Sequence, residues 1–233
     1  EEMVTEVQAN PLLRKSANKH GIESFDKITA NDYREAAKAG MAKEKERIAA
    51  IVANSASPTF ENTINAMDKS GEELTRALMT FSPLSSSNST AEFRDLQKEM
   101  SPLLSAHSDD IYMNRQLFEK VKKVYDEMDT TALSHEQVKT TEKIYKAFLR
   151  SGANLSDADQ QKLRELNQKI SALQIQFSQN LLHETNNTYV TVDRLSDLEG
   201  LPEANIQRAA KMAEEQGEKG KWMFNMQRAS CNP

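Results

Sequence analysis

The sequence is poor in cysteine, glycine and proline, and each shortage narrows the range of possible folds. Cys231 is the only cysteine among 233 residues, so a disulfide framework and a cysteine-based zinc site are both excluded. Seven glycines and six prolines give few tight turns, whereas helix-forming residues such as Ala, Leu, Glu, Lys, Gln and Met are plentiful. We therefore expect a mainly helical protein.

Long apolar runs and an excess of positive charge are missing as well. No run reaches the roughly 18 apolar residues that a membrane-spanning helix needs, and residues 1–9 lack the basic and then apolar layout of a signal peptide. Lys and Arg number 30 against 35 Asp and Glu, a net charge of −5 that argues against a nucleic-acid partner. We expect a soluble protein of the cytoplasm or of a bacterial periplasm.

The longest regular pattern lies between Ser156 and Asn186. Its apolar residues recur at steps of three and four, which is typical of one face of an α-helix; they are Leu163, Leu166, Ile170, Leu173, Phe177 and Leu181. Ser156 can cap the start, and neither Pro nor Gly interrupts the pattern. At 1.5 Å per residue the helix would be roughly 45 Å long. We expect other helices to pack along its apolar face.

Five further helices are predicted before this one, each bounded by a capping or breaking residue. They run from Asn31 to the break at Asn54, from Thr59 to Pro83, from Ser89 to Met113, from Asn114 to Met128 and from Ser134 to Gly152. Pro102 lies inside the third pattern and predicts a kink or a boundary there, because proline cannot donate a helical hydrogen bond.

The character of the sequence changes after the long helix. Thr188–Val192 is rich in β-branched and aromatic residues, and Trp222–Met226 is a second apolar run of strand length. A helix that opens at Leu201-Pro202 separates them. The predicted parts are an extended N-terminal arm (residues 1–28), a helical bundle (29–187) and a strand, helix, strand unit (188–233). The predicted fold class is mainly α: a multi-helix antiparallel bundle with a long central helix and a small β element near the C-terminus.

The sequence contains no complete catalytic motif. His183-Glu184 begins an HExxH pattern, which places two imidazoles one helical turn apart on zinc, but Asn187 stands where the second His is needed. We interpret His183 as a residue favoured by the helix dipole near a C-terminus. Ser70-Gly71 is interpreted as turn chemistry. We therefore predict no catalytic, cofactor-binding or metal-binding residue in this chain, and no bound zinc.

Several short segments along the chain are specific when taken together. They are Phe25–Ile28, Pro58–Ile64, Ser70–Arg76, Asp109–Asn114 followed by Leu117-Phe118, Ser151–Leu155 and Leu198–Pro202 with Lys221-Trp222. They resemble the N-terminal part of the thimet-oligopeptidase-like zinc peptidases, in particular the bacterial peptidyl-dipeptidase (dipeptidyl carboxypeptidase) branch. The resemblance spans the chain from about Asn10 to Pro233.

The resemblance implies a long, almost entirely helical enzyme of two lobes around a deep channel, with an HExxH zinc site in its C-terminal half. This chain would then be the non-catalytic N-terminal lobe of a zinc-dependent peptidase that hydrolyses short peptides and releases C-terminal dipeptides. Its partners would be short peptides and its own catalytic half, and its cofactor a zinc ion held outside this chain.

Two other interpretations stay open at this point. One is a helical protein-interaction module without catalytic activity, and the other is a free-standing regulatory homologue that lacks the catalytic half. If the peptidase interpretation holds, the apolar surface that meets the catalytic half should be exposed. We expect that surface in the terminal strand, at Trp222, Met223, Phe224 and Met226.

Overall fold

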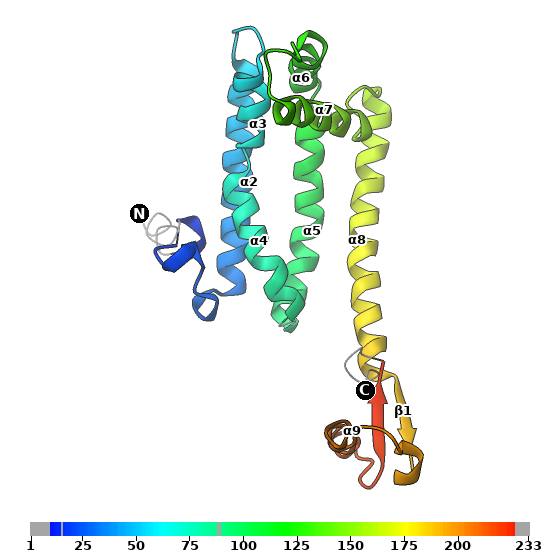
Figure 1. The fold of residues 1–233 in the computed structure, drawn as a ribbon. Coiled ribbons are helices and arrows are strands. Elements are labelled where there is room, and N and C mark those ends of the chain that lie inside the picture. The colour runs from blue at the N-terminus through cyan, green and yellow to red at the C-terminus, as the bar shows by residue number, and fades with distance from the viewer. Residues whose placement is uncertain (1–9, 15, 88–89, 227–233) are drawn as a thin grey trace. The chain divides into compact units, whose positions relative to one another are not determined.

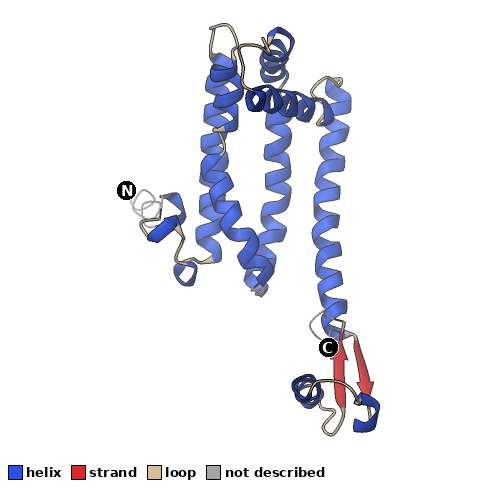
Figure 2. Cartoon of the chain, in the orientation of Figure 1, coloured by secondary structure: helices blue, strands red, loops and turns tan. Residues whose placement is uncertain are grey.

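The computed structural model describes residues 10–14, 16–87 and 90–226, and it confirms the predicted mainly helical fold. The chain forms two compact units, Glu1–Ala172 and Leu173–Pro233, and the boundary between them falls inside the longest helix. Helices dominate the described residues, and the strands are confined to one small sheet (Figures 1 and 2). The predicted division into an arm (residues 1–28), a helical bundle (29–187) and a strand, helix, strand unit (188–233) stays a prediction.

The first unit begins with short 3₁₀ turns at Pro11–Leu13, Lys19–Gly21 and Phe25–Lys27. A π-helical turn, Phe60–Asn65, precedes α3. The α-helices are, in chain order, α2 (Ala30–Ala53), α3 (Ala66–Asp68), α4 (Glu72–Ser87), α5 (Ala91–Tyr112), α6 (Arg115–Glu127), α7 (His135–Arg150) and α8 (Asp157–Asn187), of which α8 continues into the second unit.

Two apolar clusters hold the first unit together. One joins α2, the π-helical turn, α6 and α7; its buried members are Ile48, Ile51, Ile64, Met67, Ile111, Leu117, Phe118, Val121, Val124, Ile144, Phe148 and Ala153. The other joins the N-terminal segment to α2, α4 and α5; its buried members are Leu12, Ile28, Ala30, Tyr33, Ala36, Ala37, Leu74, Ala77, Phe93, Leu96 and Met100. The predicted helices therefore bury their apolar faces against one another.

The capping residues explain where several helices begin. Thr59, Asn114 and Ser134 accept backbone hydrogen bonds at the starts of their helices, as predicted. The predicted cap Asn31 is wrong, because Thr29 caps α2 through a reciprocal pair of hydrogen bonds with Asp32. The predicted start at Ser89 lies outside the described residues, and Thr90 caps α5.

Two prolines lie inside helices: Pro83, which was predicted to end its helix, and Pro102, which was predicted to give a kink or a boundary. α4 continues through Pro83 to Ser87, and α5 runs through Pro102 without a boundary. Both prolines keep contact with solvent. On a solvent-facing side of a helix, water can satisfy the carbonyl group that loses its partner, which lowers the cost of an interior proline.

Helix α8 has the predicted extent but not the predicted burial. It spans 31 residues and none of them is buried. The expectation that other helices cover its apolar row is wrong for the residues that the structure describes. Within the first unit, α8 instead meets its neighbours through polar groups: Asn167 donates to Asp109, Arg164 pairs with Asp110, and the hydroxyl groups of Ser101 and Ser171 lie 2.5 Å apart.

The second unit contains the predicted strand, helix, strand sequence. β1 (Tyr189–Val192) pairs antiparallel with β2 (Trp222–Asn225), with Val190 opposite Phe224, and α9 (Glu203–Glu215) lies between them in sequence. The expectation that the terminal strand exposes its apolar residues is largely wrong. Met223 is buried and Trp222 and Phe224 are half-buried, so that only Met226, just after the strand, is well exposed.

Candidate functional site

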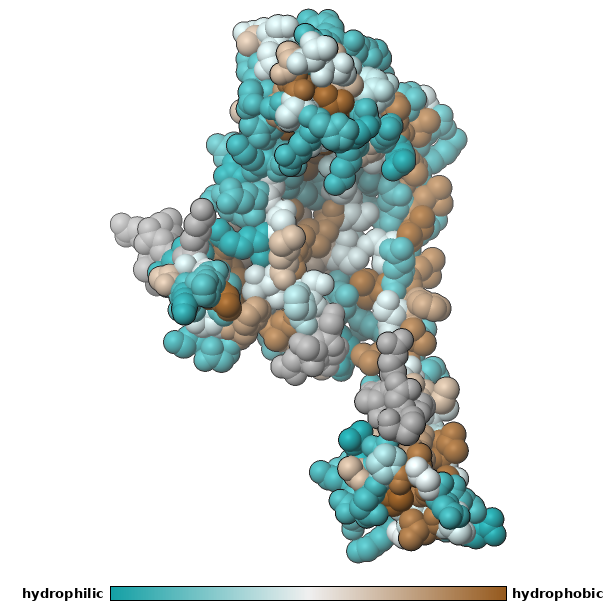
Figure 3. All heavy atoms as spheres, viewed as in Figure 1, coloured by the Kyte–Doolittle hydropathy of each residue, from teal (hydrophilic) through white to brown (hydrophobic). Residues whose placement is uncertain are grey.

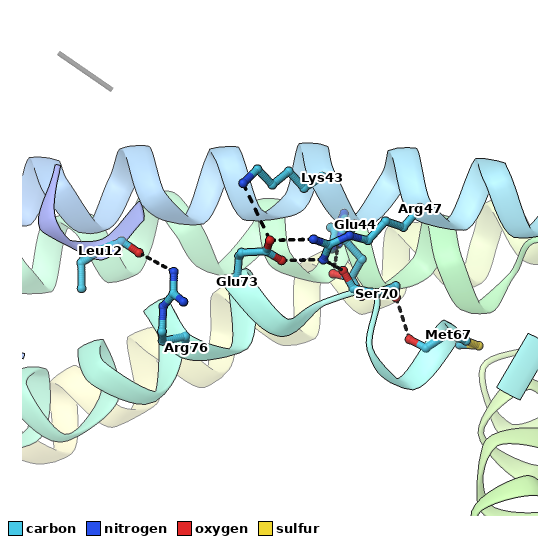
Figure 4. A network of polar contacts seen from close by, with 9 residues as sticks. Leu12, Lys43, Glu44, Arg47, Met67, Ser70, Glu73 and Arg76 are labelled. Carbon is cyan, nitrogen blue, oxygen red and sulfur yellow. Dashed lines mark hydrogen bonds and ion pairs between the residues drawn. The ribbon is translucent and has the colours of Figure 1, made fainter. Parts of the chain in front are cut away.

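An enclosed group of polar side chains in the first unit joins α2, α5 and the turn before α4. The carboxylate of Glu44 lies 2.8 Å from Nε2 of His107 and 3.5 Å from the hydroxyl group of Ser70. His107 is 5% exposed and Ser70 is 1% exposed, so both are closed off from solvent. Figure 4 shows Glu44 directed from α2 toward Ser70 at the start of the next helical segment. A serine, a histidine and a carboxylate this close together are candidates for a catalytic site.

Two glycines allow the helices to come close enough for these side chains to meet. A Cβ atom on Gly40 would lie 2.8 Å from Cα of Leu74, so the backbones of α2 and α4 come close together at this point. A Cβ atom on Gly71 would lie 2.6 Å from Oε1 of Glu44. Real Cβ atoms do not approach other atoms this closely, so glycine is needed at the first position, where the obstacle is backbone.

The arrangement of Ser70, His107 and Glu44 is not that of a catalytic triad. In a triad the nucleophilic hydroxyl group donates its hydrogen bond to the imidazole. Here the hydroxyl group of Ser70 donates to the carbonyl oxygen of Met67 at 2.7 Å, and both the hydroxyl and the imidazole approach the same carboxylate. The other imidazole nitrogen, Nδ1 of His107, is buried without a partner in the part of the chain that the structure describes. The group is therefore a buried brace between helices.

A second polar contact joins α2 to α4 beside this brace. Arg47 contacts Glu73 through both guanidinium Nη atoms, at 2.5 and 2.6 Å, and also donates to the carbonyl oxygen of Ser70 at 2.8 Å (Figure 4). The hydrogen bonds from Arg47 lower the pKa of Glu73 to about 2. A paired arginine of this kind fixes two helices in register.

A cavity of about 560 Å³ lies next to Arg47, between α2 and the π-helical turn. It is lined by Arg47, Ala50, Ile51, Asn54, Asn62, Ala66, Lys69 and Glu72. Because Arg47 is already neutralised by Glu73, and Lys69 and Glu72 carry opposite charges, the lining favours neither anions nor cations. The residues that line the cavity therefore indicate no particular class of ligand.

Two adjacent carboxylates on α5 respond oppositely to their surroundings. Burial raises the pKa of Asp109 even though Asn167 donates to its Oδ1 atom at 2.8 Å. Burial also acts on Asp110, but Lys45 and Arg164, each at 2.8 Å, outweigh it and lower the pKa of Asp110. Such a split occurs at catalytic acid and base pairs. Here, however, the side chains that contact the two carboxyl groups within the described residues belong to α2 and α8, so the role of these carboxyl groups is to hold helices together.

The residues that suggested a zinc site are not brought near further ligands. His183 lies near the end of α8, its side chain is 72% exposed, and its Nδ1 atom lies 3.7 Å from the carboxylate of Glu184. Asn187 ends the same helix. Across residues 10–14, 16–87 and 90–226, no three His, Cys, Asp or Glu side chains gather as a metal ion would require. The prediction that this chain binds no zinc stays a prediction.

Sequence reasoning missed the brace and the arginine pair altogether. Glu44 and His107 are 63 residues apart, and Arg47 and Glu73 are 26 apart, so no local spacing connects them. The only local signal was Ser70-Gly71, interpreted as turn or cap chemistry inside one helix from Thr59 to Pro83. The structure places a turn there, so the single helix is wrong: it is divided into the π-helical turn, α3 and α4. No helix in the described part of the chain combines the length and the apolar character that crossing a membrane requires.

Comparison with known proteins identifies peptidases as relatives. Dipeptidyl carboxypeptidase of Escherichia coli (strain K12) is 34% identical over 96% of this chain and 33% of its own length. The protein of the same name from Salmonella typhimurium is 31% identical over 97% of this chain and 33% of its length. Oligopeptidase A of Haemophilus influenzae is 28% identical over 97% of this chain and 32% of its own length. No protein-family model matches the chain. The chain thus spans about a third of the length of the curated relatives it matches.

Proposed function

This chain belongs to the peptidase family that includes dipeptidyl carboxypeptidase and oligopeptidase A, and we propose that it is the N-terminal, non-catalytic lobe of a zinc-dependent peptidase. The complete enzyme would hydrolyse short peptides and release dipeptides from their C-termini. The observation that carries the proposal is the match to dipeptidyl carboxypeptidases over 96 and 97% of this chain.

Among the residues that the structure describes, the side chains of this lobe do not fit a zinc site of their own. Zinc peptidases use three protein ligands drawn from His and Glu or Asp. His183 is followed by Glu184, but Asn187 stands where the second imidazole ligand is needed, and no third ligand lies beside them in the described residues. In the proposal the zinc ion is therefore held by residues beyond this chain. Its role there would be that of a Lewis acid in peptide hydrolysis.

The proposed contribution of this lobe is mechanical and steric. The braces between α2, α4 and α5 would keep the bundle rigid, so that it forms one wall of a channel for extended peptides. Partly exposed polar groups that pair across two helices, such as Arg47 with Glu73, favour one arrangement of helices over competing ones. A rigid wall would exclude folded proteins by size.

The test is to express the complete reading frame and the 233-residue chain side by side. We expect the complete protein to hold one zinc per chain and to release C-terminal dipeptides from short peptides in a chelator-sensitive manner. We expect the 233-residue chain to retain no zinc after dialysis and to cleave nothing. Release of single amino acids or cleavage at internal bonds would reject the dipeptidase activity, and cleavage by residues 1–233 alone would reject the lobe assignment.

A helical interaction module without catalytic activity is the second candidate. The exposed apolar residues of α8 favour it, because such residues mark binding surfaces. A stop codon directly after Pro233 in the native gene would support it against the peptidase, while an HExxH sequence further along the frame would reject it.

A further inference from the structure

The second unit exposes a regular apolar row on α8. Leu173, Phe177 and Leu181 follow one another at steps of four, so they share one face of the helix. Their exposed fractions are 62, 69 and 57%. Figure 3 shows hydrophobic side chains uncovered along this helix. A row of three large apolar side chains on three successive turns is more than the scattered apolar residues of an ordinary surface.

The same stretch of α8 has no charged side chain. From Ser171 to Leu182 the sequence contains no Asp, Glu, Lys or Arg, although these residues make up 28% of the whole chain. The solvent side of a surface helix is normally charged or strongly polar. The cores of protein interfaces, in contrast, are depleted of charge. The composition of this stretch is therefore that of a covered surface.

Nothing in the described part of the second unit covers the row. The buried residues of this unit are Leu198, Ala209, Ala213, Met223 and Asn225, which belong to α9, β2 and the 3₁₀ turn Leu195–Leu198. No residue of α8 is buried. The small core of the unit thus forms without burying the row.

We propose that the face formed by Leu173, Phe177 and Leu181 is the docking surface for an apolar segment from the remaining two-thirds of the longer peptidase. The inference rests on the proposed function, because it takes the missing partner from the same protein. The part that the relatives share with this chain is 33% of their own length, so a protein of their length supplies ample chain for this contact. Side chains four residues apart on an α-helix suit an apolar groove or a second helix laid along the row.

The residues that flank the row favour this occupant over a second copy of the chain. In helical dimers the positions beside the apolar row usually carry Glu and Lys, whose charges select partner and orientation. Here the flanking residues Gln174, Gln176 and Asn180 are uncharged amides. Amides can be buried against hydrogen-bonding partners within one protein, but they do not select a partner by charge.

The experiment measures thiol labelling at single cysteines in the complete protein and in the 233-residue chain, with Cys231 replaced by Ser in both. Gln174→Cys places the thiol beside the row and leaves Leu173, Phe177 and Leu181 in place. Gln168→Cys is the matched control: it is exposed, it lies on the same helix, and nine residues before Phe177 it faces the opposite side. Labelled peptides are identified by mass spectrometry, so other cysteines of the complete protein do not interfere.

We expect Gln174→Cys to be labelled at least about tenfold more slowly in the complete protein than in the 233-residue chain, because a docked surface must open before it reacts. Gln168→Cys should differ by less than about twofold between the two proteins. Adding Phe177→Ser to the complete protein should restore fast labelling at Gln174→Cys, and Leu181→Ser is the second variant if the first fails to fold.

Each other outcome rejects the inference or separates it from the proposed function. Equal labelling of Gln174→Cys in both proteins would overturn the docking surface even if the complete protein is an active peptidase. Protection that appears in the 233-residue chain and grows with its concentration would assign the surface to a second copy and reject the proposed occupant. Protection in a complete protein that holds no zinc and cleaves no peptide would keep the docking surface and reject the peptidase function.

Discussion

Helices α7 and α8 carry the same local pattern but differ completely in burial. Ile144 and Phe148 on α7 stand four residues apart, as do Leu173 and Phe177 on α8. Phe148 is fully buried among the rings of Tyr112 and Phe118, whereas Phe177 is 69% exposed. The apolar period thus fixes which face of a helix is apolar. Whether that face is covered depends on the neighbours that the fold brings to it.

The largest expected effect tests this comparison directly. Phe148→Ala should lower the free energy of unfolding of the first unit by about 3–5 kcal/mol, because it removes buried area and leaves a cavity. Phe177→Ala should change the stability of the 233-residue chain by less than about 0.5 kcal/mol, since the ring already faces solvent. Urea unfolding followed by circular dichroism measures both. A cost above about 2 kcal/mol for Phe177→Ala would show that the ring is covered in solution.

The next effect concerns the close approach of α2 and α4. Gly40→Ala should destabilise the first unit by about 1–3 kcal/mol, because its Cβ atom would lie 2.8 Å from Cα of Leu74. Ala49→Gly on the exposed side of the same helix is the control, and it should cost about 1 kcal/mol through helix propensity alone. Thermal unfolding of the two variants gives the comparison. A more stable Gly40→Ala variant would contradict the observed contact between the helices.

A smaller effect distinguishes the two carboxylates that hold α8. Asp109→Asn should raise the stability at pH 7 by about 1 kcal/mol, because it removes a buried charge with one unpaired oxygen and keeps an acceptor for Asn167. Asp110→Asn should lower it by about 1 kcal/mol, because both Lys45 and Arg164 lose their charged partner. Denaturant titrations at pH 7 test both signs. The same sign for both substitutions would refute the assignment.

The last comparison concerns Glu73 and Tyr33, whose contributions to the free energy of unfolding change only at the extremes of pH. Arg47 lowers the pKa of Glu73 from 4.5 to about 2, so this stabilisation is complete above pH 4.5 and is lost as the pH falls toward 2. Burial raises the pKa of Tyr33 from 10.0 to about 12, so its stabilisation is complete below pH 10 and is lost as the pH rises toward 12.

Matched variants isolate these two contributions. The stability difference between the native chain and Glu73→Gln should be constant from pH 5 to 9 and should shrink below pH 4.5. Tyr33→Phe should remove part of the alkaline loss above pH 10 and none of the acid loss. A difference for Glu73→Gln that does not depend on pH would exclude the proposed effect of Arg47 on this carboxylate.

Local sequence predicted the positions of the helices well and their ends less well. Thr59, Asn114 and Ser134 act as predicted caps, because a cap needs only its own side chain and the next three residues. Pro83 was wrongly predicted to end its helix, and of the two alternatives for Pro102, a kink or a boundary, the boundary is wrong. The cost of an interior proline depends on whether solvent reaches the freed carbonyl group, which local sequence does not tell. The exposed apolar surface was predicted at Trp222 and Phe224, but the structure has it on α8. The reason is similar, because the exposure of a side chain depends on residues far away in the sequence.

The sequence by itself determined most of the helices, the two strands and the similarity of this chain to peptidases. The helices and strands follow from residues near one another in the chain, and the similarity is a 34% identity with a dipeptidyl carboxypeptidase over 96% of this chain. Only the tertiary structure decided that Glu44 meets His107, that Arg47 pairs with Glu73, and that α8 turns amides and an arginine rather than its leucines toward α5. The physical reason is that such contacts join residues from 26 to 63 positions apart, and their formation depends on how closely whole helices pack.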